Sequence, residues 1–190
     1  MLSARLRAVF ALKAMIIELT TIVERPKAIE LTVASDKIDL EIEGAKVTGD
    51  VVFRGETERI NDKAHVRGTV NAEVNVECTR CLDAVTQKFE IVFDDVFVDP
   101  EAESTDAEIA LEGDDLDEAI AIDGRIDLGE VVREQIILAL PDQVFCREDC
   151  KGLCPKCGSN RNLIDCKCIE AEIDPRWLAL KDAVNRESNR

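Results

Sequence analysis

The chain has 190 residues, of which 46% are hydrophobic and 34% are charged, and its formal net charge is −16. This length fits one large domain, or a medium-sized domain with a small appendage, and the hydrophobic fraction is sufficient for a buried core. No uninterrupted apolar run approaches the roughly 18 residues of a membrane span, so the sequence predicts no membrane-spanning helix.

The first residues, MLSARLRAVFALKA, are a weak match to a targeting segment, since their apolar part is short and is interrupted by Lys13. They show no small-residue cleavage pattern. From Met15 onward the sequence MIIELTTIVERPKAIEL begins like an ordinary domain, so we expect Met15 to be the native start. Because a convincing secretory signal is lacking, we expect a cytoplasmic protein.

Residues 15–98 are predicted to form an antiparallel β domain. In the run KAHVRGTVNAEVNVEC, apolar side chains alternate with polar ones up to Cys78, which is the period of a half-buried strand. After TRCLD the chain returns through a second alternating run that contains Phe89, Ile91 and Phe93. Short strands separated by Gly and Asn/Asp turns predict an antiparallel barrel or sandwich, with Cys78 and Cys81 at a hairpin turn.

Residues 99–124 are predicted to be an acidic connecting segment. Fourteen of the 40 Asp and Glu residues lie between residues 89 and 124, a stretch without Lys or Arg. The rest of the chain is therefore close to neutral. Such a segment repels phosphate and can attract a basic partner; the alternative is a solvated loop without a binding role.

Residues 125–141 are predicted to form an amphipathic helix that packs on the sheet. Asp127 and Glu130 can form a capping box, and Ile126 and Val131 a hydrophobic staple. Pro141 ends the helix. The predicted face is largely apolar and comprises Leu128, Val131, Val132, Gln135, Ile136, Ala139 and Leu140. Together with the β domain, this helix predicts an α+β fold.

Residues 146–190 are predicted to be a small Cys-rich module with a terminal helix, for which Asp174 is the N-cap and Pro175 lies in the first turn. Thiols at C-x2-C spacing serve as metal ligands, redox pairs or disulfides. The missing secretory signal disfavours disulfides, and no helix pattern follows either C-x2-C pair, which disfavours a redox pair. Metal binding is the strongest interpretation.

The eight cysteines divide into two groups of four. In CPKCG, proline fixes the backbone after Cys154 and glycine tolerates the turn after Cys157, while Cys166 and Cys168 supply two further thiolates. Four thiolates make a closed, structural site for zinc, although iron fits the same geometry. The second group would be Cys78, Cys81, Cys146 and Cys150. Alternatively, Cys78 and Cys81 bind no metal, and one of them is a buried structural thiol. Cys150 is also placed to compete for the downstream ion, so the chain would bind one ion or two.

The order ECTRCL, IDLGEVVREQIILALP, CREDCKGLCPKCGSNRN, CKC and DPRWLALK resembles the YceD family of large ribosomal RNA subunit accumulation proteins. The resemblance covers residues from about 70 to 182 and is most specific from Asp127 to Arg176. It implies a role in assembly of the large ribosomal subunit and in accumulation of its 23S RNA. Family genes commonly neighbour that of a small basic large-subunit protein, which implies a shared pathway.

The sequence bears on three classes of function. An assembly factor would hold a basic large-subunit protein, or a precursor of the 50S particle, through the acidic segment. A protein that binds 23S RNA directly would use the lysine and arginine side chains that lie among the cysteines. Aromatic residues, on which RNA bases could stack, make up only 4% of the chain. The same positively charged residues could equally serve to balance the negative charge of the thiolates. They are Arg147, Lys151, Lys156, Arg161, Lys167 and Arg176. For an enzyme, the single histidine, His65, lies in a strand pattern and no nucleophile–base pair can be assembled, so we expect no catalytic activity.

Overall fold

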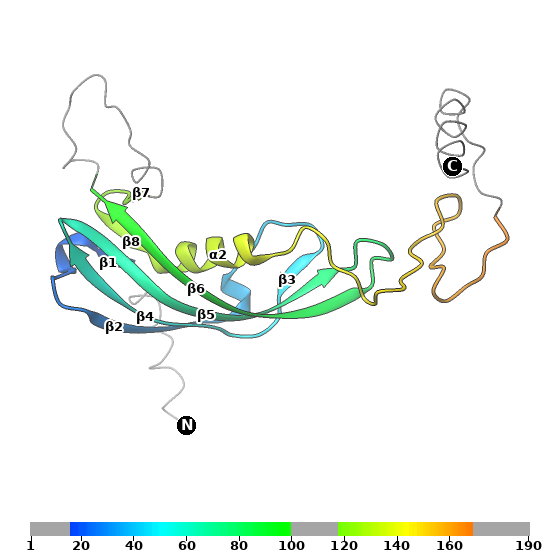
Figure 1. The fold of residues 1–190 in the computed structure, drawn as a ribbon, viewed down its shortest axis with the longest axis horizontal. Coiled ribbons are helices and arrows are strands. Elements are labelled where there is room, and N and C mark those ends of the chain that lie inside the picture. The colour runs from blue at the N-terminus through cyan, green and yellow to red at the C-terminus, as the bar shows by residue number, and fades with distance from the viewer. Residues whose placement is uncertain (1–15, 100–117, 169–190) are drawn as a thin grey trace, which may run out of the picture.

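The structure is a computed structural model that describes residues 16–99 and 118–168 (Figure 1). Three sequence predictions therefore lie outside the described residues: the start at Met15, the middle of the acidic segment, and the terminal helix from Asp174. The elements are β1 (Ile16–Glu18), η1 (Leu19–Thr21), β2 (Lys27–Val33), η2 (Ser35–Lys37), β3 (Ala45–Val47), β4 (Val51–Ile60), β5 (Lys63–Glu77), β6 (Ala84–Val98), β7 (Glu118–Ile120), β8 (Arg125–Asp127) and α2 (Leu128–Ala139).

One curved sheet dominates the fold. Its strand order is β2-β4-β5-β6-β7, and β3 adds to β5 beyond the end of β4. The long hairpin of β4 and β5 turns at Asn61 and Asp62, which both have positive φ, as the favoured two-residue hairpin turns require. A separate antiparallel pair joins β1 to β8. The α+β class is confirmed.

Within the described residues the sheet does not close into the predicted barrel, because its path ends at β2 on one side and β7 on the other. Nor is it wholly antiparallel, since β7 runs parallel to the end of β6. The stretch 99–124 is therefore more than a connection. Its last part pairs Ala119 with Phe97 and buries Ala121 completely, because small apolar side chains there fit against the core.

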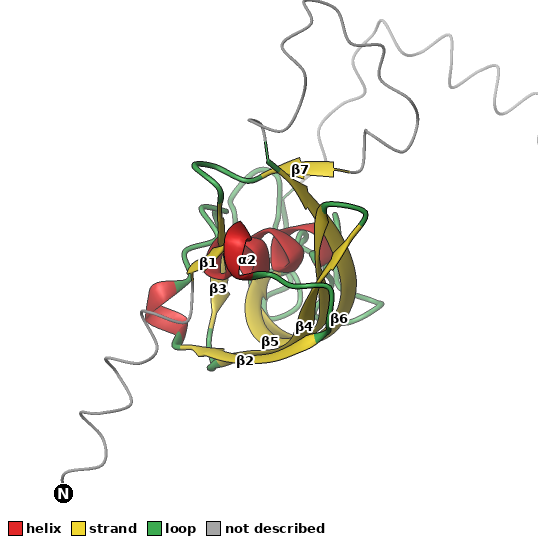
Figure 2. Cartoon of the chain, turned by 90° about the vertical axis from the view of Figure 1, so that its left-hand side faces the viewer, coloured by secondary structure: helices red, strands yellow, loops and turns green. Residues whose placement is uncertain are grey.

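The sheet bends as a whole, and two glycines face each other on its central strands. Gly55 of β4 lies opposite Gly68 of β5, and the ring of Phe53 covers both on the inner face. A Cβ atom added to Gly68 would lie 2.6 Å from the Cα of Gly55 and 2.6 Å from Cε2 of Phe53. Only glycine leaves room for this approach of backbone and ring. The bend lets the sheet wrap around α2 (Figure 2).

The helix α2 fills the concave face of the sheet. Asp127 is its N-cap and accepts a hydrogen bond of 2.8 Å from the N–H of Gly129. Glu130 does not complete the expected capping box within the described hydrogen bonds; its carboxylate instead lies 3.5 Å from Arg133. Of the predicted apolar face, Leu128, Val131, Val132 and Ile136 are buried in the core. Their burial joins the helix to the core of the sheet.

Candidate metal centres

Two cysteines lie in the turn between β5 and β6. Cys78 continues the ladder, because its N–H donates to the carbonyl of Asp83 over 2.9 Å. Leu82 closes the turn by donating to the carbonyl of Cys78, with a positive φ of 62°. Cys78 is completely buried and Cys81 is 4% exposed. The end of the longest hairpin in the described sheet thus presents two buried thiols.

The segment after α2 is fastened to this turn by backbone hydrogen bonds. The N–H of Thr79 donates to the carbonyl of Val144 over 2.8 Å, and the N–H of Leu153 donates to the carbonyl of Arg80 over 2.9 Å. The Arg80 guanidinium also stacks on the ring of Phe145, 4.2 Å from its centroid. These contacts bring the intervening chain, with its own two cysteines, against the turn.

The resulting proximal cysteine group consists of Cys78, Cys81, Cys146 and Cys150, whose sulfur atoms all lie within 4.8 Å of one another. Two of the distances are 3.8 Å between Cys78 and Cys150 and 3.5 Å between Cys81 and Cys146. Four sulfurs placed tetrahedrally about 2.3 Å from a zinc ion are about 3.8 Å apart. The donor set and its spacing therefore fit one tetrahedral metal ion.

The distal cysteine group consists of Cys154, Cys157, Cys166 and Cys168, whose sulfurs also lie within 4.8 Å of one another. Its first half is a tight turn in which the N–H of Gly158, at φ 72°, donates to the carbonyl of Cys154 over 2.8 Å. The hydroxyl of Ser159 lies 3.1 Å from the sulfur of Cys157. These are the same two groups of four that the sequence spacing predicted.

In the proximal cysteine group the thiols differ in acidity. Burial opposes ionisation of Cys78, but hydrogen bonds from the N–H groups of Cys146, Arg80 and Cys81 outweigh it and lower its pKa to about 6. The N–H of Asp83 favours the Cys81 thiolate, yet burial and the hydrogen bond that its S–H donates to the Asp83 carboxylate raise the pKa of Cys81. Packed sulfurs without a cation share protons in this way, because adjacent thiolates repel.

The distal cysteine group shows the same division. A hydrogen bond from the side chain of Ser159 is the main cause that lowers the pKa of Cys157 to about 6. The neighbouring Cys157 sulfur, together with burial, raises the pKa of Cys168 to about 12. Each group thus contains two thiols whose pKa is lowered, Cys78 and Cys150 in one and Cys154 and Cys157 in the other, beside at least one thiol whose pKa is raised. A divalent cation would remove this conflict, since it favours all four thiolates.

Three polar residues that the sequence analysis did not single out connect the two groups. Asn162 lies between Cys157 and Cys166, yet its side-chain amide donates to the sulfur of Cys150 over 3.3 Å. Asn160 reaches the carboxylate of Asp83 over 3.2 Å. The only sequence signal for these residues is the run NRN between Cys157 and Cys166, and asparagine is equally common in ordinary turns. The loop of the distal group therefore supports the proximal one.

The remaining candidate residues lie elsewhere. His65 is on the sheet, with its ring nitrogen 3.4 Å from a carboxylate oxygen of Asp94. Among the bases expected to face RNA, Arg147 lies 3.5 Å from Asp149. Those that the structure describes are exposed; besides Arg147 they are Lys151, Lys156, Arg161 and Lys167. Arg176 lies outside the described residues.

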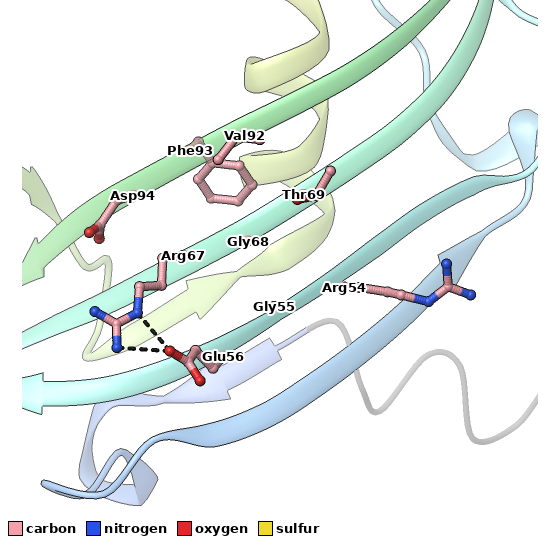
Figure 3. A pocket seen from close by; sticks show the side chains of 9 residues that line it. All are labelled: Arg54, Gly55, Glu56, Arg67, Gly68, Thr69, Val92, Phe93 and Asp94. Carbon is pink, nitrogen blue, oxygen red and sulfur yellow. Dashed lines mark hydrogen bonds and ion pairs between the residues drawn. The ribbon is translucent and has the colours of Figure 1, made fainter.

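A shallow hollow of about 720 Å³ lies on the sheet face opposite α2, around the glycine pair (Figure 3). Its arginines are already paired: Arg67 contacts Glu56 at 2.8 Å, and Arg54 contacts Glu30 at 2.9 Å. The hollow therefore presents little unpaired positive charge to an anion. Val92 of β6 borders it and is 78% exposed.

No helix in the described part of the chain is both long enough and apolar enough to cross a membrane.

Comparisons with known proteins point in one direction. A family model described as large ribosomal RNA subunit accumulation protein YceD matches residues 66–182. An uncharacterized protein of Mycobacterium leprae is 30% identical over 171 residues, which are 88% of this chain and 76% of that protein. An uncharacterized protein of Mycobacterium tuberculosis is 31% identical over 139 residues, 70% of this chain and 61% of that protein.

A chloroplastic protein of Zea mays, named large ribosomal RNA subunit accumulation protein YCED homolog 1, is 26% identical over 167 residues, 76% of this chain and 56% of that protein. The chain thus spans less than two thirds of the length of the Mycobacterium tuberculosis and Zea mays relatives. No solved structure matches the chain.

Proposed function

The chain belongs to the YceD family, whose model is described as a large ribosomal RNA subunit accumulation protein, and on that premise we propose that it is a non-catalytic assembly factor. It would act in the cytoplasm, in assembly of the large ribosomal subunit and accumulation of 23S RNA. The description of the family supports the process, and the charges and cysteines of this chain support the manner that we propose.

We propose that the chain holds a basic large-subunit protein before that protein joins the RNA. The observation that carries this is the charge of β6 and the stretch that follows it, where residues 89–124 contain fourteen acids and no base. Free ribosomal proteins carry many unpaired positive charges, and an acidic surface would neutralise them while repelling RNA. Among the described acids of this stretch, Glu118 is already paired with Lys63. Glu90 and Asp94 lie on the exposed face of β6 and are better placed to act, although Asp94 also lies 3.4 Å from the ring nitrogen of His65.

We propose further that each cysteine group holds one structural zinc ion. The support is the closed set of four sulfurs, the spacing in the proximal group, and the mismatched protonation of each set without a cation. Zinc supplies cross-linking here, because four protein ligands leave no open position for a substrate. In the proximal group, Cys78 and Cys81 would join the end of the sheet to the C-terminal segment through Cys146 and Cys150.

Direct binding of 23S RNA by the Cys-rich module is the second candidate. One observation favours it: Lys151, Lys156, Arg161 and Lys167 are exposed between the metal ligands. Exposed lysine and arginine side chains on a rigid module can contact RNA phosphates without any stacking on the nucleobases. Against it, the whole stretch 146–190 has nine bases and eight acids, so its net positive charge is small.

Affinity capture from cells, with and without ribonuclease treatment, tests these proposals. If the chain holds a ribosomal protein, one basic large-subunit protein should stay bound after ribonuclease and leave as salt is raised, because exposed charges are screened beyond about 8–10 Å. If the module binds RNA, recovery should depend on intact RNA, and replacing Lys151, Lys156 and Arg161 should abolish it. Recovery of neither a large-subunit protein nor 23S RNA would contradict both proposals.

A further inference from the structure

The strand β6 has one long edge without a partner strand in the described chain. It pairs with β5 from Ala84 to Phe97, but it meets β7 only at Val96–Val98. Within residues 16–99 and 118–168, nothing else pairs with the other edge of residues 84–95 (Figure 1). This is most of a 15-residue strand.

The register identifies which backbone groups face this open edge. The N–H of Cys78 donates to the carbonyl of Asp83, so Asp83 is in a hydrogen-bonded pair with β5. Because hydrogen-bonded pairs recur at every second residue of an antiparallel pair, the odd-numbered residues of β6 bond to β5. Even-numbered residues then point outward, as the carbonyl of Val98 does when it accepts from the N–H of Ala121. The N–H and C=O groups that face the open edge therefore belong to Thr86, Lys88, Glu90, Val92 and Asp94.

Proteins usually protect such edges with proline, inward-pointing charges, a bulge or a very short strand. Residues 84–94 contain no proline and no inward-pointing charge; the inward-facing acid of β6, Asp95, lies beyond them and accepts from the side-chain amide of Gln135 over 3.0 Å. Their one positively charged residue, Lys88, lies 3.4 Å from the carboxylate of Glu73. Val92 is 78% exposed in the middle of the edge. An unpaired strand of this length with an exposed apolar residue is a template for one more strand.

The side chains along the edge define what that strand would carry. Val92 stands between Glu90 and Asp94 on the outer face, two residues from each, so an added strand would place its own side chains beside these three. Lysine or arginine beside Glu90 and Asp94, with an apolar residue beside Val92, is the complementary pattern. On the inner face, apolar side chains would cover Phe89 and Ile91, which are only partly buried.

From these observations we propose that the open edge of β6, residues Thr86–Asp94, binds an extended basic and apolar segment of a partner protein as an additional β-strand. The inference rests on the proposed function, for which it provides the docking surface. Backbone hydrogen bonds would supply affinity, and Glu90 and Asp94 would select for positive charge.

Amide hydrogen exchange on the full, metal-loaded chain tests the open edge directly. The N–H groups of Thr86, Lys88, Glu90, Val92 and Asp94 should exchange fast, while those of Val85, Gln87, Phe89, Ile91 and Phe93 should be protected by β5. Protection of both sets in the isolated chain would overturn the proposal, because the edge would already be occupied. A dimer that protects these amides as concentration rises would overturn it in favour of self-pairing.

A synthetic peptide, acetyl-Ser-Lys-Val-Val-Val-Lys-Ser-amide, serves as the probe for binding. It should protect the outward-facing amides of β6, and the same peptide with glutamate in place of both lysines should bind roughly tenfold more weakly or worse. No protection on β6, or equal binding of the two peptides, would contradict the proposal.

Val92→Pro separates this inference from the proposed function. Proline at position 92 removes an N–H that faces the open edge but breaks no hydrogen bond to β5, so the variant should still fold and bind zinc. Val92→Thr keeps this N–H and is the matched control. Val92→Pro should lose the basic large-subunit protein captured by the wild type, and Val92→Thr should retain it. Equal capture by both variants would overturn the inference and leave the proposed function standing, whereas failure of the wild type to capture any such protein would overturn both.

Discussion

The side-chain amide of Asn162, in the loop of the distal cysteine group, donates a hydrogen bond over 3.3 Å to the sulfur of Cys150, which belongs to the proximal group. The carbonyl oxygen of the same side chain accepts from the N–H of Lys151 over 2.8 Å. Asn162 thus fixes both a ligand of the proximal cysteine group and the backbone that follows it. The distal loop has to be folded before Asn162 can take this position, so the two groups are structurally coupled.

Replacing Asn162 with alanine should weaken metal binding in the proximal group alone. Outer-shell partners of metal ligands typically contribute about 10–100-fold in affinity. One of two zinc ions should therefore pass faster to a colorimetric chelator in Asn162→Ala. Leu163→Ala is the matched control, because Leu163 is 81% exposed in the same loop. Identical release rates in the two variants would show that the hydrogen bond does not support the metal site.

The wild-type chain should contain two zinc ions, and loss of either group should have different consequences. Cys157→Ser should lose one ion while the sheet keeps its thermal transition, because Cys157 is exposed and lies outside the core. Cys78→Ser should also lose one ion but lower the melting temperature, because Cys78 is completely buried where the C-terminal segment meets the sheet. Elemental analysis and calorimetry measure both. One ion in the wild type would exclude a second site.

Metal binding should be linked to protons in a defined direction. At neutral pH the metal-free chain holds Cys78 and Cys157 as thiolates, because the pKa of each is lowered to about 6. The pKa values of Cys81 and Cys168 are raised, so these two sulfurs lose their protons only to the metal.

Calorimetric titration of the metal-free chain with zinc, in buffers of different ionisation enthalpy, should show proton release at neutral pH. Below pH about 6, Cys78 and Cys157 of the metal-free chain take up protons too, so zinc has to displace more protons, and its affinity and the stabilisation it gives should fall more steeply as the pH is lowered. Affinity that stays constant across this range would contradict thiolate ligation.

The glycine pair should tolerate no side chain. In Gly68→Ala the new Cβ would lie 2.6 Å from backbone of Gly55 and from the ring of Phe53, so the strand or the ring must shift. Overpacking of this kind costs about 1–3 kcal/mol in the free energy of unfolding. Gly49→Ala is the control, since the nearest atom to its Cβ would be 4.0 Å away. Chemical denaturation of the zinc-loaded variants compares them; equal stability would show that the bend does not depend on glycine.

Local patterns in the sequence predicted the elements of this fold well. Strict alternation up to Cys78 indicated β5, and Asp127 marked the start of α2, because both signals depend on neighbouring residues. The closure of the sheet was not predictable, since alternation is the same in an open sheet and a barrel. The parallel β7 was hidden by its acidic surroundings, because its two apolar residues, Ala119 and Ile120, are both exposed and only Ala121 beyond it is buried.

The cysteine groups could be divided from spacing because C-x2-C pairs constrain their members to one turn. The supporting residues could not be found in this way. Asp83, Asn160 and Asn162 come together only when the segment after α2 folds back on the β5–β6 turn, and that contact spans 77 residues between Asp83 and Asn160. Likewise, which edge of β6 is open depends on the pairing of all the strands.

The most direct measurement of the central claim is the state of the large ribosomal subunit in cells that lack this protein. The level of mature 23S RNA, and the ratio of large to small subunits in sucrose gradients, should both fall. The wild-type chain should restore them, whereas a chain with Glu90→Gln and Asp94→Asn, folded and zinc-loaded, should restore them less. Unchanged 23S RNA and an unchanged subunit ratio in the absence of the protein would contradict the account.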